Sequence, residues 1–157
     1  MERRQQEVER FQELNQVKVE NKISPYRYVI STERYEIFGQ LVQASSHSRT
    51  IHGGNLTLLC PTDEAFDNFD TWKMMLRKGN QQDVDDFVAN HVIPVTMTYG
   101  DFKSKDEHTT LAGTRIEVST RGGIYANGAH VRSGHVATEN GSVIGLDDVV
   151  FTPLSLR

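Results

Sequence analysis

The sequence contains a single cysteine, Cys60, and no long hydrophobic run. A lone cysteine cannot form a disulfide within the chain, and this leaves the cellular compartment open, since exported proteins without disulfides exist. No apolar stretch approaches the roughly 20 residues that a membrane-spanning helix needs. The formal net charge of −4 is mild and of the wrong sign for a nucleic-acid-binding protein. We therefore expect a protein that neither spans a membrane nor binds nucleic acid.

The motifs of common enzymes are also missing. No Gly-x-Ser-x-Gly elbow occurs, and the pairs Gly53-Gly54 and Gly122-Gly123 lack the helix and lysine of a phosphate-binding loop. A cysteine nucleophile would need a base beside Cys60, and His91 is a candidate for that base. Cys60 closes an apolar run, however, where a free cysteine usually acts as a small hydrophobic residue. The sequence predicts no catalytic residue.

Metal-ligand patterns are equally weak. Asp83, Asp85 and Asp86 fall in the first turn of an expected helix, where carboxylates match the positive end of the helix dipole. They lack the loop spacing of a calcium site. His130 and His135 have no cysteine or carboxylate cluster to complete a zinc site and are expected at the surface. The sequence predicts neither a metal nor a cofactor.

The first 22 residues lack the apolar core of a signal peptide, so either a leader has been removed or the chain is not exported. Apolar residues recur there every three positions, at Val8, Phe11, Leu14 and Val17. This stripe predicts a helix over residues 2–17, either laid across the domain or used for self-association. We assign residues 1–22 to an N-terminal helical extension and residues 23–157 to one domain.

The stretch from residue 55 to residue 69 organises that domain. Leu56 to Cys60 is a short apolar run that predicts a buried strand, and Pro61 ends it because proline has no N–H for a strand ladder. Thr62 is expected to cap a short helix with its side-chain oxygen. Ala65 and Phe66 lie on the apolar side of that helix. A strand that turns into a helix is therefore expected to meet one core.

Helical patterns dominate the first part of the chain and strand patterns the last. Apolar spacing predicts helices near residues 33–42, 72–76 and 83–91, with a polar loop at residues 47–54. Short β-type segments follow Pro94, at residues 95–98, 111–113, 115–120, 123–126, 130–132 and 136–138. Asn-Gly pairs between them favour tight hairpins. This order predicts an α+β fold.

Four motifs in order carry a resemblance to a known family. They are Pro61-Thr62-Asp63-Glu64-Ala65-Phe66 after a strand, His91-Val92-Ile93-Pro94, Thr110-Leu111-Ala112-Gly113, and the segment from Asn140-Gly141 through Asp147 to Pro153. In this order and spacing, residues 24–154 resemble the fasciclin-like domain. The resemblance implies a wedge-shaped β-sandwich with a helical layer.

The same resemblance implies a function and a set of residues. Fasciclin-like domains mediate cell adhesion or protein contact, so we expect a non-enzymatic binding module with a protein, cell-surface or matrix partner. Most members are exported, which implies an extracellular or periplasmic location, although a cytoplasmic one stays open. Asn90-His91 occupies the place of the family's Tyr-His pair and is the candidate binding position. The motif residues expected to be structural are Pro61, Thr62, Asp63, Ala65, Phe66, His91, Asn140, Gly141, Asp147 and Pro153.

Particular positions refine this expectation. Asp147 is expected to accept backbone N–H bonds and so fix the last strand. Gly145 stands where the family has a histidine. Two alternatives stay open: a carrier of an apolar small molecule such as a carotenoid, as in some algal members, and a scaffold that self-associates through residues 1–22.

Overall fold

The structure is a computed structural model that describes residues 17–20 and 23–150. Within these residues the larger sheet has the strand order β1-β8-β9-β2-β3, formed by Val17–Glu20, His135–Thr138, Gly141–Leu146, Leu56–Pro61 and Val92–Ile93. The smaller sheet has the order β4-β5-β6-β7, formed by Glu107–Thr109, Arg115–Ser119, Tyr125–Ala126 and Ala129–His130.

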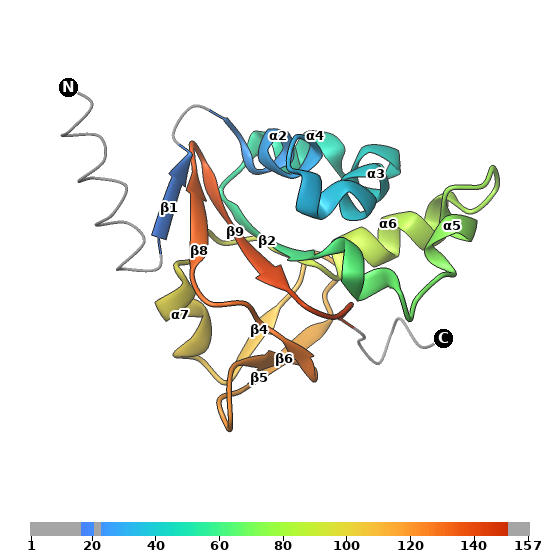
Figure 1. The fold of residues 1–157 in the computed structure, drawn as a ribbon. Helices are drawn as coiled ribbons and strands as arrows, with labels where there is room; N and C mark the ends of the chain where they lie inside the picture. Colours follow the sequence, from blue (N-terminus) through green and yellow to red (C-terminus); the bar gives the residue numbers. More distant parts are fainter. Residues whose placement is uncertain (1–16, 21–22, 151–157) are drawn as a thin grey trace.

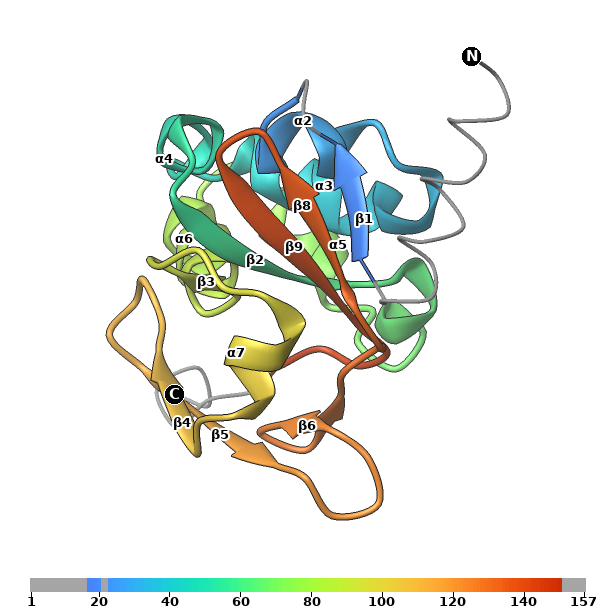
Figure 2. The same ribbon diagram turned by 90° about the vertical axis from the view of Figure 1, so that its left-hand side faces the viewer.

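The helices fall mainly in the first part of the chain. They are α2 (Pro25–Ile30), α3 (Glu36–Ala44), α4 (Ser48–Gly53), α5 (Trp72–Met75), α6 (Gln81–Ala89) and α7 (Tyr99–Lys103), with 3₁₀ turns η1 (Glu33–Tyr35) and η2 (Asp63–Phe66). Helices α2, α3 and α4 lie on one side of the larger sheet, and the smaller sheet lies on the other (Figures 1 and 2). The predicted α+β class with a helical layer is confirmed.

The parallel strands β2 and β9 form the centre of the molecule. Every residue of both strands is buried, which explains why the run from Leu56 to Cys60 reads as continuously apolar. Successive side chains point to opposite faces. Leu58 and Val143 therefore join one hydrophobic cluster with the helices, whereas Leu59 and Ile144 join a second with the smaller sheet. One apolar strand thus serves two cores.

The break at Pro61 leads into η2, so the predicted turn from strand to short helix is confirmed. Phe66 is 2% exposed and lies in the helical cluster. The predicted cap is wrong in detail, because the Thr62 side chain makes no capping bond. The Thr62 carbonyl accepts the Ala65 N–H at 3.0 Å instead, and the Thr62 N–H donates to Leu146 at 3.0 Å. Thr62 therefore extends the contact between β2 and β9.

The helix predicted over residues 2–17 is wrong at its end. Residues 17–20 form β1, which pairs in parallel with β8. The alternation of Val17 and Val19 with Lys18 and Glu20 is a strand pattern, and the edge of β8 supplies the hydrogen bonds that a strand needs. The rest of the predicted helix lies outside the described residues.

The strand predicted at residues 95–98 is also wrong, although β5 to β8 match the later β-type segments within two residues. Buried hydroxyls replace a strand ladder here: Thr57 donates to the Val95 carbonyl at 2.7 Å, and Ser142 donates to the Met97 carbonyl at 2.6 Å. Thr98 then caps α7 in a capping box with Asp101. The loop predicted at residues 47–54 contains α4, and residues 111–113 form a turn.

Candidate functional site

The candidate binding pair, Asn90-His91, directly follows α6 and is buried. His91 is 0% exposed, and the rings of Phe87 and Phe38 lie 4.6 and 5.6 Å from its own ring. Its Nδ1–H donates to the Phe87 carbonyl at 2.8 Å, and its Nε2 accepts the Val150 N–H at 3.1 Å. Both ring nitrogens are therefore occupied, one as a donor and one as an acceptor, as in a neutral imidazole.

Burial lowers the pKa of His91 to about 4, although the hydrogen bond with Phe87 acts in the opposite direction. Asn90 is 3% exposed, and its Oδ1 accepts a hydrogen bond from the Thr114 hydroxyl at 2.6 Å. Neither side chain is available to a partner in this structure. The pair connects α6 to the segment after β9 and to the turn before β5.

The two motif segments meet at one end of the central strands. Pro61 lies opposite Leu146 in the parallel register of β2 and β9, so the residues that follow each strand emerge side by side. Asp63 follows β2, and its carboxylate accepts the Ile37 N–H at 2.9 Å. Ile37 is in the first turn of α3, where the amide groups have no partner within the helix. Asp63 therefore caps a helix that precedes it by 26 positions.

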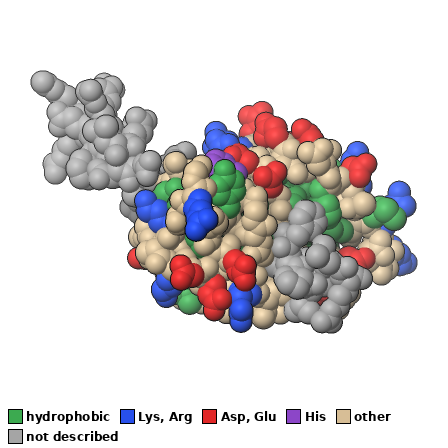
Figure 3. Space-filling view, turned by 90° about the horizontal axis from the view of Figure 1, so that it is seen from below, with side chains coloured by type: hydrophobic (Ala, Val, Ile, Leu, Met, Phe, Trp, Pro, Cys, Tyr) green, Lys and Arg blue, Asp and Glu red, His purple; other side chains and the backbone are tan. Residues whose placement is uncertain are grey.

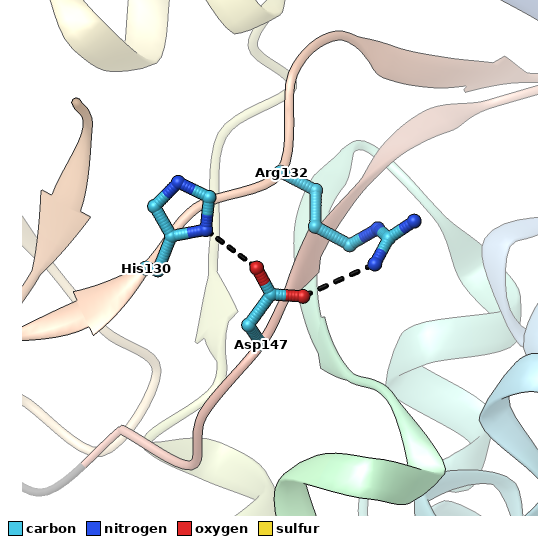
Figure 4. Close-up of polar contacts among 3 residues, drawn as sticks. All are labelled: His130, Arg132 and Asp147. Atoms are coloured by element: carbon cyan, nitrogen blue, oxygen red, sulfur yellow. Dashed lines mark hydrogen bonds and ion pairs between the residues drawn. The ribbon is translucent and has the colours of Figure 1, made fainter.

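Asp147 follows β9 and joins two side chains from the segment before β8 (Figure 4). His130 Nδ1–H donates to one carboxylate oxygen at 2.5 Å, and Arg132 donates to the other at 3.1 Å. Partial burial raises the pKa of Asp147, but these two hydrogen bonds outweigh it and hold the pKa below its ordinary value. The predicted bonds from backbone N–H groups are wrong, because side chains take their place.

A surface groove of about 910 Å³ lies between these two segments. Asp63 and Glu64 of the first segment, Asp147 of the second, and Arg132, which bonds to Asp147, line it. Glu33 and Arg34 of η1 also line it, and both are exposed. His130, Arg132 and Arg34 were not among the predicted site residues. No local pattern marks them, because only the pairing of β2 with β9 brings these segments together.

Glycines in the second motif allow close packing. A Cβ at Gly141 would lie 2.7 Å from the Leu56 carbonyl oxygen and 2.8 Å from Pro25 Cγ, so only glycine fits without a shift. A Cβ at Gly145 would lie 2.6 Å from the Tyr35 hydroxyl. Tyr35 therefore fills the space beside the position where the family has a histidine.

Two further motif residues remain. Asn140 donates a hydrogen bond from Nδ2 to the Gly53 carbonyl at 3.2 Å, and Pro153 lies outside the described residues.

The side chains of Cys60, Asp85 and His135 have structural roles. Cys60 is 0% exposed, and burial raises the pKa of its thiol well above the ordinary value, which disfavours the nucleophilic thiolate. Asp85 accepts hydrogen bonds from the Ser46 N–H at 2.7 Å and from Gln81 at 2.8 Å. His135 Nδ1 accepts the Tyr99 N–H at 3.1 Å at the start of α7. Across residues 17–20 and 23–150, no three His, Cys, Asp or Glu side chains converge to hold a metal ion.

Comparison with known proteins finds one matching family and a similar solved structure. A family model described as the Fasciclin domain matches residues 33–153. A solved structure, a FAS1 domain pair from the insect cell adhesion molecule Fasciclin I, is similar with a TM-score of 0.50 at 19% sequence identity. The match covers 80% of this chain and 43% of that one. None of the helices in the described ranges is long and apolar enough to cross a bilayer.

Proposed function

Because the chain belongs to the fasciclin domain family, we propose that it is a non-enzymatic binding module that mediates cell adhesion or protein contact at a cell surface or matrix. The observation that carries the proposal is the family match over residues 33–153. An extracellular or periplasmic location follows from the family and is part of the proposal. The buried state of Cys60 and His91 supports a role without catalysis, since neither group is accessible to a substrate.

We place the contact surface at the groove between the two motif segments. Glu33, Arg34 and Glu64 are exposed there, and Arg132 and Asp147 are half-buried beside them. A groove that presents both signs of charge suits a polar protein partner, because complementary charges select the partner and set its orientation. Asp63 and the Asp147 cluster hold the walls of this groove in place.

The carrier hypothesis gains no support from the grooves of the described residues. Two of them, one beside α2 and one beside α3, include polar and charged side chains in their linings, among them Arg27, His52, Glu139 and Glu36. A carotenoid needs a mostly apolar channel. We therefore keep adhesion as the proposed function.

A charge exchange tests the proposal. In Arg34→Glu/Glu64→Lys the net charge is unchanged, but two of the three exposed charges in the groove are reversed. Lys105→Glu/Asp106→Lys makes the same exchange on an exposed loop that does not line the groove. We expect cells of the source organism to adhere to surfaces coated with the wild type and the loop variant, and to adhere several-fold less to the groove variant. Equal adhesion to all three proteins would contradict the placement, and no adhesion to any of them would contradict the function.

A further inference from the structure

Helix α5 and the turn after it form an apolar projection that the proposed function does not use. Within the described residues the exposed large hydrophobic side chains are Met74, Leu76 and Val95. Two of them, Met74 at 50% and Leu76 at 38% exposure, lie in the seven residues from Trp72 to Lys78. In Figure 1 this segment lies at the end of the molecule opposite β1. We call residues 72–78 the α5 turn.

The α5 turn packs against the core, and one of its carbonyls accepts two hydrogen bonds. Trp72 and Met75 pack against the helical cluster, and the Trp72 ring meets the Phe66 ring at 6.2 Å. The Met74 carbonyl accepts hydrogen bonds from the Arg77 N–H at 3.1 Å and from the Asn80 side chain at 2.6 Å. These contacts fix the turn in an orientation that leaves Met74 and Leu76 exposed.

Basic residues flank these two apolar ones in the sequence. Lys73, Arg77 and Lys78 are exposed, and residues 71–80 include no acidic residue, although Asp70 and Asp83 flank them. Within the described residues none of these three cations forms an ion pair, and the Lys73 ammonium lies 5.8 Å from the centre of the Trp72 ring. Figure 3 shows hydrophobic and basic side chains side by side at the end of the molecule that α5 occupies in Figure 1.

Exposed apolar side chains next to lysine and arginine are a combination that binds the surface of an anionic bilayer. The apolar groups enter the boundary between headgroups and acyl chains, and the cations meet the lipid phosphates and carboxylates. A projecting tip offers a protein partner little contact area, whereas a bilayer surface can accept it. We propose that the α5 turn docks the protein on anionic lipid, with Met74 and Leu76 inserted and Lys73, Arg77 and Lys78 on the headgroups.

This docking is independent of the groove, and the chain itself supplies a reporter for it. Trp72 is the only tryptophan in the sequence. Full-length protein is titrated with vesicles of phosphatidylcholine, with and without phosphatidylserine, while tryptophan emission is recorded. We expect a blue shift and co-sedimentation only with the phosphatidylserine vesicles, and we expect both to weaken as salt is added. The absence of binding to either vesicle would overturn the proposal.

Two variants and one control assign the contact. Met74→Ser/Leu76→Ser should abolish co-sedimentation, whereas Val95→Ser, which removes an exposed apolar side chain elsewhere, should leave it unchanged. Arg77→Gln/Lys78→Gln should weaken binding about 25-fold, at about 5-fold for each cation near an anionic surface. Equal binding by the first variant and the wild type would overturn the assignment. Loss of a protein partner by that variant, with vesicle binding intact, would also overturn it.

Discussion

The imidazole of His91 joins two distant parts of the chain, because it bonds to Phe87 in α6 and to Val150 after β9. A protonated ring would have no acceptor for the Val150 N–H. The sequence marks His91 as a motif residue and predicts a structural role for it. It does not reveal the role of the ring nitrogens, because Val150 lies 59 positions away and is placed by the fold.

We expect His91 to make stability fall in acid. The pKa of His91 is lowered by burial from 6.5 to about 4, so the unfolded chain binds more protons between these values. The contribution is fully present above about pH 6.5 and is lost as the pH falls toward 4. The advantage of wild type over His91→Gln in unfolding free energy should shrink by about 2 kcal/mol between about pH 7 and pH 5. Urea titrations at both pH values measure this, and a constant difference would contradict the buried neutral imidazole.

Phe66 is the residue by which η2 is fixed to the core. Its ring lies 6.0 Å from Phe87 and 6.4 Å from Phe69, and it is 2% exposed. We expect Phe66→Ala to lower the unfolding free energy by about 3–5 kcal/mol, as truncation of a large core side chain does. Chemical denaturation measures it. A loss below about 1 kcal/mol would show that η2 is not packed as described.

At the scale of elements, Asp63 links η2 to α3. Its carboxylate accepts a hydrogen bond from a backbone N–H at the start of α3. A helix is usually capped in this way by the residue that directly precedes it. The exposed neighbour Asp67 makes no such bond among the described contacts and serves as a control. We expect Asp63→Ala to cost about 1–2 kcal/mol and Asp67→Ala less than about 0.5 kcal/mol in unfolding free energy. Equal costs in thermal or urea unfolding would argue against the cap.

The order of elements could be predicted from the sequence wherever apolar periodicity is strong. The buried strand β2, the break at Pro61 and the amphipathic helices α3 and α6 were all predicted from their patterns. Residues 95–98 were not, because the hydroxyls of Thr57 and Ser142 satisfy their backbone groups from other strands. The groove could not be predicted either, since it exists only where β2 and β9 lie in register.

At the scale of the whole molecule, β1 changes how the N-terminal extension must be tested. Residues 17–20 pair with β8, so removing all of residues 1–22 also removes an edge strand. A chain that starts at residue 17 keeps β1. We expect it to unfold at the same denaturant concentration as the full chain, and a chain that starts at residue 23 to unfold earlier. If residues 1–16 drive self-association, sedimentation will show fewer copies per particle for the chain starting at residue 17 than for the full chain. An equal number of copies would end the scaffold hypothesis.

The groove between the two motif segments is the proposed contact surface for a protein partner. The most direct measurement is the affinity of a protein captured by the wild type from extracts of the source organism, titrated against three purified chains. These are the wild type, Arg34→Glu/Glu64→Lys and Lys105→Glu/Asp106→Lys. We expect equal affinity for the wild type and the loop variant, and at least about tenfold weaker binding, about 1.4 kcal/mol, for the groove variant. Equal affinity for all three chains would contradict it.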